Sequence, residues 1–151
     1  MKTLFRFMLV AALALAAPLA AADEMLIARS GQDFEETMST LQNAIVRHGY
    51  TVARVQRVDI GLTAKGYKTD KYRVVFFGKP AEVSMLSGKY PDLIPYLPIS
   101  VAIFAEGDNT LISTARPGVL AEFYPEPELQ PIFMRWEKDL AAIFDEVREA
   151  R

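Results

Sequence analysis

The sequence predicts an α+β fold: an antiparallel sheet of about five strands in β-α-β4-α order, with two long helices packed on one face. Two stretches, at residues 34–45 and 133–147, repeat apolar side chains every three or four positions, as helices do. Between them lie segments rich in β-branched and aromatic residues that are separated by glycine and proline. Consecutive strands combined with a few long helices are typical of an antiparallel sheet covered on one side.

The first strand and the first helix have the clearest signals. Residues 25–29 predict a short strand, and Ser30-Gly31 a turn after it. Asp33 is placed to cap the helix, with Glu36 three residues later, and Gly49 supplies the left-handed stop. The apolar stripe of this helix consists of Phe34, Met38, Leu41 and Ile45.

The middle of the chain predicts four strands. Residues 50–58 form the first of them, with Val52, Arg54, Gln56 and Val58 on one face, and residues 59–71 form a loop with at most one helical turn. A strong strand covers 72–77, a short helix 81–89, and prolines keep 91–98 irregular. Strands at 99–105 and 110–115 are joined by a turn at 106–109, and the last helix follows.

Two strands are apolar on both sides, which is unusual for a sheet with one wet face. Residues 74–77 and most of 99–105 are apolar in both phases. The second face of the sheet is therefore covered either by segment 80–98 or by another subunit. The second alternative predicts a homodimer.

The first 22 residues predict a cleavable signal peptide. Two basic residues precede an apolar stretch at 7–20, and Pro18 interrupts that stretch before it reaches the roughly 20 residues of a membrane-spanning helix. Small residues at Ala20 and Ala22 predict cleavage before Asp23. The alternative is an uncleaved anchor, which length and Pro18 disfavour. We expect a periplasmic or secreted protein, without stable membrane insertion, whose single domain spans 23–151.

Composition excludes several classes of function. The chain has a formal net charge of −2 at pH 7, and the leader takes away only basic residues, so the remaining domain is mildly acidic. Such a domain presents no basic surface for nucleic acid. The absence of cysteine excludes disulfides and thiol chemistry, and a single histidine, His48, argues against a zinc or copper site. We expect no metal and no cofactor.

Several short motifs resemble the bacterial "domain of unknown function 302" family over residues 25–150. They are His48-Gly49-Tyr50 after the first helix, the strand that runs into Phe77-Gly78-Lys79-Pro80, and Leu97-Pro98 before a hydrophobic strand. The resemblance implies the same order of elements and a tendency to pair as dimers, and it implies no biochemical role.

Two departures from the family pattern bear on chemistry. One branch carries cysteines where this chain has Gly78 and Ile99, so the thiol chemistry of that branch cannot operate here. The other branch reads Phe-Gly-Asn-Pro, and Lys79 replaces its asparagine, which exchanges a neutral amide for a cation.

The candidate ligand site consists of the Gly78-Lys79-Pro80 turn, Pro98 and Arg116. Prolines cannot donate to a sheet ladder, so the strands must part at these positions and leave a hollow floored by apolar residues. Lys79 and Arg116 beside irregular backbone would hold a small anionic ligand. The alternative is that glycine and proline only shape the turn and that Lys79 is solvated.

Two functions follow, and the sequence favours the first. The first is non-enzymatic binding of a small molecule or a partner protein. The alternative is a small periplasmic hydrolase that uses Asp59 or Asp70, loop carboxylates that would have to share a cleft with a basic group. No catalytic residue is assigned, because the chain contains no nucleophile elbow and no phosphate-binding glycine motif.

Overall fold

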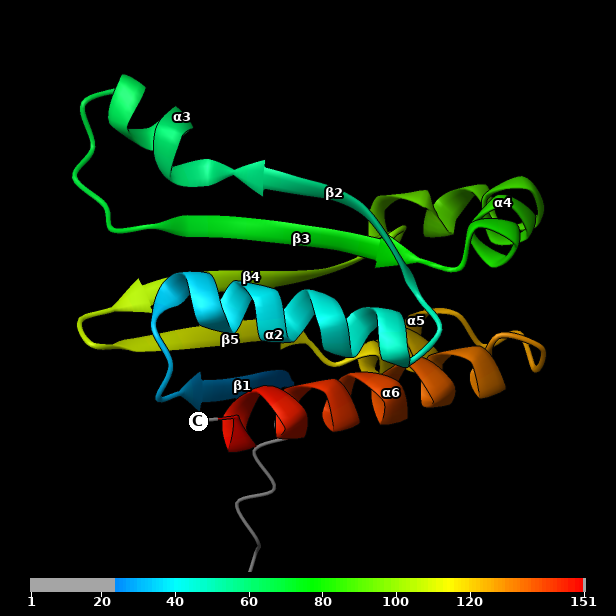
Figure 1. Cartoon of the computed structure of the whole chain (residues 1–151). Helices are drawn as coiled ribbons and strands as arrows, with labels where there is room; N and C mark the ends of the chain where they lie inside the picture. The colour runs from blue at the N-terminus through cyan, green and yellow to red at the C-terminus, as the bar shows by residue number, and fades with distance from the viewer. Residues whose placement is uncertain (1–23, 151) are drawn as a thin grey trace, which may run out of the picture.

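The computed structural model describes residues 24–150 and contains a five-stranded antiparallel sheet in the order β1-β5-β4-β3-β2 (Figure 1). The leader predicted over residues 1–22 lies outside the described residues. The strands are β1 (Met25–Ser30), β2 (Thr51–Arg57), β3 (Tyr72–Gly78), β4 (Ile99–Glu106) and β5 (Asn109–Ala115). The helices are α2 (Phe34–Arg47), α3 (Val58–Ala64), α4 (Pro80–Lys89), α5 (Leu120–Phe123) and α6 (Gln130–Glu149), with 3-10 turns η1 (Pro91–Tyr96) and η2 (Pro117–Val119).

The predicted fold class, an antiparallel sheet of five strands with helices, is confirmed, with additional short helices between the main elements. The two long helices, α2 and α6, lie side by side on one face of the sheet (Figure 1). The segment after β2 forms a full short helix, α3, and the segment predicted to be irregular before β4 contains the 3-10 turn η1. No described helix combines the length and the apolar character that crossing a membrane requires.

Helix α2 begins and ends where its capping residues lie. The Asp33 side chain accepts a hydrogen bond of 2.9 Å from the backbone N–H of Glu36, which satisfies one of the free donors of the first turn. Gly49 follows the helix with a φ of 79°, a conformation that glycine adopts without strain. Both features agree with the sequence prediction.

The core fills the space between α2, α6 and the inner face of the sheet. From the sheet it receives alternate residues of every strand except β2, among them Val75 and Phe77. Each large side chain buried in this way contributes about 1.5–3 kcal/mol relative to exposure. The fully or almost fully buried members from α6 are Phe133, Trp136, Leu140, Ile143, Phe144 and Val147.

The predicted alternation of β2 is wrong, because the strand contains a bulge. Val52 pairs with Phe77 and Arg54 pairs with Phe76, so these two β2 residues lie on opposite faces of the sheet. The extra residue at Ala53 shifts the register, as a β-bulge does. Val58 does not belong to the strand and begins α3.

The sheet face opposite α2 and α6, here called the outer face, carries apolar side chains along all strands except β2. Ile27 is 54% exposed and Met25 41% exposed, and the more central members are half-buried. Segment 80–98 forms α4 and η1 and lies at one end of the sheet instead of across it (Figure 1). The other apolar residues of this face are Tyr72, Val74, Phe76, Ala102, Phe104, Leu111 and Ala115. Arg29, Ser100 and Ser113 lie among them.

Candidate functional site

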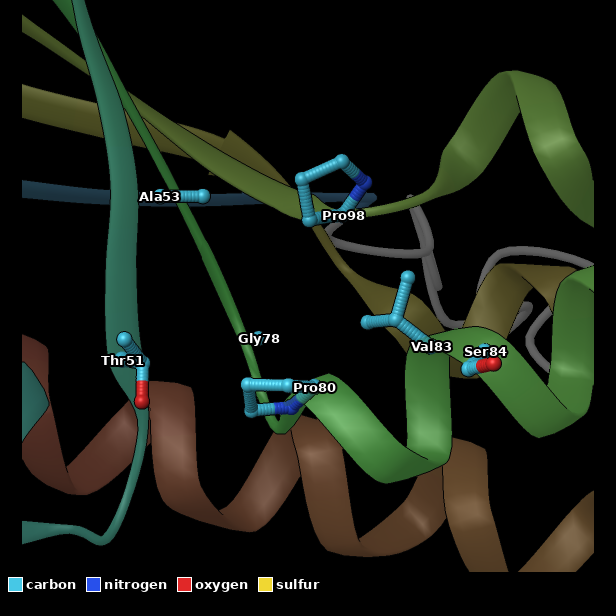
Figure 2. Close-up of a pocket in the computed structure, with 7 residues that line it drawn as sticks. All are labelled: Thr51, Ala53, Gly78, Pro80, Val83, Ser84 and Pro98. Carbon is cyan, nitrogen blue, oxygen red and sulfur yellow. The ribbon is translucent and has the colours of Figure 1, made fainter.

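A hollow of about 330 Å³ lies between the start of β2, the end of β3 and the first turns of α4, and we call it the strand-end pocket (Figure 2). Strand β2 forms one wall and α4 the other, while Val83 points toward the gap between Gly78 and Pro98. The lining is apolar apart from the hydroxyl groups of Thr51 and Ser84. It consists of Thr51, Ala53, Gly78, Pro80, Val83, Ser84 and Pro98.

The glycine and the prolines have separate roles in building this pocket. A Cβ on Gly78 would lie 2.8 Å from Val83 Cγ2 and 3.5 Å from Pro98 Cβ, so only glycine lets α4 come this close. Pro80 occupies the first turn of α4, where its missing N–H costs nothing. The Leu97–Pro98 peptide bond is cis. Three residues of the predicted site, Gly78, Pro80 and Pro98, thus line one pocket.

Lys79 lies in the same turn but does not line the pocket, and its ammonium group lies over the Tyr50 ring. Its Nζ is 5.0 Å from the centroid of the Tyr50 ring. Within residues 24–150 no carboxylate lies within ion-pair distance of Lys79. Its backbone carbonyl accepts from the N–H of Val83 at 2.9 Å and so begins α4.

A polar cluster behind Lys79 joins α4 to α6. Glu82 accepts hydrogen bonds from Arg135 and from Trp136 Nε1, the latter at 2.9 Å. The Tyr50 hydroxyl donates to Asp139 Oδ2 at 2.7 Å and accepts from Arg135 at 3.2 Å. Burial, together with the neighbouring Asp139 carboxylate, holds the pKa of Tyr50 well above its usual range.

Arg116 lies in a different hollow, which we call the aromatic pocket. Its guanidinium pairs with Glu137 Oε1 at 3.0 Å, and Glu137 Oε2 accepts from the Gly118 N–H at 2.8 Å. The structure therefore does not place Arg116 and Lys79 around one ligand position. The aromatic pocket measures about 220 Å³, and its main apolar lining residues are Tyr96, Ile99, Leu120, Phe123 and Trp136.

The two carboxylates of the hydrolase hypothesis lie in different surroundings. Asp59 pairs with Arg73, and both side chains are largely buried. Burial raises the pKa of Asp59, but hydrogen bonds from Arg73 and the Ile60 backbone, together with nearby positive charge, outweigh it and leave the pKa below its usual value. Asp59 is thus held as a carboxylate and cannot serve as a general acid near neutral pH.

Asp70 borders a third hollow, of about 420 Å³, together with Lys71. This does bring a carboxylate and a basic group into one place, but the Lys71 ammonium is bonded to Glu35 at 2.8 Å. The lining residues described there include no serine, threonine or tyrosine to act as a nucleophile.

The single histidine, His48, forms a contact between α2 and α6. His48 follows the last residue of α2, and its Nε2 lies 2.8 Å from Glu146 Oε1 on α6, whose carboxylate also accepts from Arg47. Hydrogen bonds from Arg47 and His48 hold the pKa of Glu146 below its usual value. Among residues 24–150 no group of three or more histidine, aspartate or glutamate side chains is arranged to hold a metal ion.

Four of the seven residues that line the strand-end pocket, Thr51, Ala53, Val83 and Ser84, were not predicted as site residues. Thr51 and Ala53 come from β2, where a bulge shifts the pairing with β3, and bulges leave little trace in composition. The polar cluster did leave a signal, since Arg135 and Asp139 have the i, i+4 spacing of a helical ion pair and Glu82 lies in the first turn of α4.

Comparisons with known proteins agree with this architecture. No curated protein matches the chain. A crystal structure of an uncharacterized conserved protein, DUF302, from Bacillus stearothermophilus is similar in fold, with a TM-score of 0.74 and 23% sequence identity, over 84% of this chain and 100% of that one. The family profile "Domain of unknown function DUF302" matches residues 27–147. The chain therefore belongs to the DUF302 family.

Proposed function

We propose that this protein is an exported, non-catalytic domain that binds a small molecule in the strand-end pocket. The observation that carries the proposal is the pocket itself, whose volume of about 330 Å³ falls in the range of small-molecule sites. Its apolar lining and two hydroxyl groups suit a ligand with an aliphatic body. No described acid with a shifted pKa lines it, which favours binding over catalysis.

The ligand carries one anionic group, which Lys79 recognises. In the free protein the Lys79 ammonium rests over the Tyr50 ring, a contact worth about 0.5–1 kcal/mol at exposed sites. A hydrogen bond to a charged group contributes about 1.5–3 kcal/mol. A ligand carboxylate at the pocket mouth would therefore draw the Lys79 side chain away from the ring.

The partner of the domain is a second copy of itself, docked through the outer face. The exposed Ile27 and Met25 and the apolar side chains between them and Phe76 support this arrangement. Gly78 follows Phe76 by two residues and shares its face, so the strand-end pocket opens at the edge of the same surface. Export is supported by the basic, then apolar, then small-residue order of the leader.

The ligand proposal is tested by calorimetry with hexanoate and its neutral analogue hexanol. Hexanoate should bind more tightly, and Lys79→Asn should bring the two affinities together, while Lys79→Arg should preserve the difference. Ala53→Phe places a ring in the pocket from an exposed strand position and should abolish both. If neither compound binds, or if Ala53→Phe changes nothing, the pocket is not the binding site.

A native mass spectrum of protein purified from its own periplasm tests the proposal without a chosen probe. A retained molecule that disappears in Ala53→Phe supports a ligand site in the strand-end pocket. A chain that is always recovered bare, and that also fails to bind hexanoate, would favour a role in protein interaction alone.

A further inference from the structure

We propose that the aromatic pocket is a second binding site, for a small neutral ligand that contains an aromatic ring. This pocket shares no lining residue with the strand-end pocket, although Pro98 of the strand-end pocket and Ile99 of the aromatic pocket are neighbours in the chain. Binding in the two pockets can therefore be tested separately.

The size of the pocket sets the size of the ligand. Its volume is about 220 Å³. An apolar cavity of roughly 150 Å³ already accepts benzene. A molecule with one or two rings would therefore fit, whereas a long acyl chain or a nucleotide would not.

The aromatic walls favour a ring as the occupant. Tyr96 and Trp136 line the pocket at the two ends of a chain of ring contacts, of which two are edge-to-face and the one at Trp136 is tilted. Tyr124 and Phe133 connect them, with centroid separations of 6.1 Å, 6.3 Å and 5.7 Å along the chain. A ligand ring would extend this arrangement, since aromatic pairs prefer edge-to-face or offset contacts.

The walls are held in place before a ligand arrives. The Tyr124 hydroxyl donates to the Asp92 carbonyl at 2.7 Å, and Trp136 Nε1 donates to Glu82 at 2.9 Å. A site that is already ordered loses little conformational freedom on binding.

Charge in the lining favours a neutral ligand. Among the described residues of the lining, Arg116 is the only charged one, and Glu137 pairs with it at 3.0 Å. The Glu137 carboxylate is in turn bound to the Gly118 N–H, and a Cβ on Gly118 would lie 2.5 Å from Glu137 Oε2. A carboxylate ligand would have to compete with this pair, whereas a neutral ring would not.

The mouth of the pocket has apolar surface to bury. Phe123 lines it and is 71% exposed, and Tyr96 is 51% exposed. An aromatic ligand would cover part of both rings, and removal of apolar surface from water is the main driving force for such binding.

Toluene and benzoate test the proposal on the full chain, with fluorescence of Trp136 as the readout. Trp136 is the only tryptophan of the chain and forms part of the pocket wall. Toluene should give a saturable change in emission. Benzoate should bind with a dissociation constant at least about tenfold higher, which corresponds to about 1.4 kcal/mol of binding free energy. Equal affinity for both would overturn the neutral ligand class.

Two matched alanine-to-phenylalanine variants locate the response. Ala115→Phe fills the aromatic pocket from an exposed position on β5 and should weaken toluene binding by at least about tenfold. Ala53→Phe fills the strand-end pocket and should leave the Trp136 response unchanged. The reverse pattern would place toluene in the strand-end pocket and overturn the proposal.

Phe123→Ala is a second variant that does not depend on tolerating a larger side chain. Because Phe123 is exposed, the fold should be unaffected, and toluene affinity should fall several-fold as the ring at the mouth is lost. If wild type shows no saturable response to toluene, the aromatic pocket is not a site for this ligand class and the proposal is overturned.

Discussion

Trp136 on α6 donates its indole N–H to the Glu82 carboxylate on α4 across 2.9 Å, and this bond connects the wall of the strand-end pocket to the core. Glu82 also accepts from Arg135, and its side chain is only 18% exposed. A partly buried carboxylate therefore helps to fix the position of α4, together with Leu86, which α4 buries in the core.

Glu82→Ala should destabilise the protein, because it leaves the Trp136 and Arg135 donors without their acceptor. An unsatisfied buried polar group costs about 1–3 kcal/mol. Urea unfolding should report this loss, and Trp136 emission should shift to the red as water reaches the indole N–H. Asp145→Ala is the control, since its ion pair with Arg148 is half exposed on both sides and such pairs contribute little. Equal stability of Glu82→Ala and wild type would contradict this role.

Gly78→Ala should destabilise the protein by forcing α4 away from the sheet. The new Cβ would lie 2.8 Å from Val83 Cγ2, and overpacking of this kind costs about 1–3 kcal/mol. Thermal unfolding should show the loss, and the Gly78→Ala/Val83→Ala double variant should recover part of it because the clashing methyl group is gone. A double variant no more stable than Gly78→Ala would contradict the proposed contact.

Gly88 in the same helix provides the matched control for that series. A Cβ there would meet nothing within 4 Å. Gly88→Ala should therefore stabilise the protein, by about 0.4–1 kcal/mol, through the lower conformational entropy of the unfolded chain.

Asp59→Asn should change the pH dependence of stability. The pKa of Asp59 in the folded protein lies below the model-compound value of 3.8, so its ionised form stabilises the fold at higher pH. This contribution is complete above that value and is lost as the pH falls through the lower, folded pKa. Wild type should thus exceed Asp59→Asn in unfolding free energy near pH 7, and the gap should narrow in acid.

Asp108→Asn serves as the control for the acid series, because Asp108 lies in the exposed turn between β4 and β5 and asparagine suits that turn equally well. A constant gap between Asp59→Asn and wild type across the same range would show that the Asp59–Arg73 pair does not contribute through ionisation.

The elements of this fold were predictable where local chemistry determines them. Asp33 caps α2 and Gly49 ends it. In both cases the residue affects only the backbone within a few positions of itself. The turn at Gly107, with a φ of 61°, likewise joins β4 and β5 as expected. Such features need no knowledge of the rest of the molecule.

The candidate site was predictable only in part, because its geometry depends on distant contacts. Gly78, Pro80 and Pro98 meet because prolines and glycine mark the strand ends. Lys79 and Arg116 do not lie together, because Lys79 contacts the Tyr50 ring and Arg116 pairs with Glu137. Neither contact can be read from spacing in the sequence. The bulge at Ala53 was missed for the same reason, as the register of β2 is set by its pairing with β3.

The leader predicts the start of the exported chain. Small residues at Ala20 and Ala22 place the cleavage before Asp23. The intact mass of protein recovered from the periplasm or culture medium should correspond to residues 23–151. A recovered chain that still begins at Met1 would contradict both cleavage and the export proposal.

Dimerisation through the outer face is tested by one substitution on each side of the molecule. Wild type at micromolar concentration should scatter light as twice the chain mass. Ile27→Lys adds a charge to the outer face at a residue that is already 54% exposed, so the fold should persist while the dimer is lost to the cost of burying that charge. Val46→Lys makes the same kind of change on α2, where the residue is 61% exposed on the opposite layer, and it should remain dimeric. A monomeric wild type, or equal loss in both variants, would mean that the outer face is not the contact between copies.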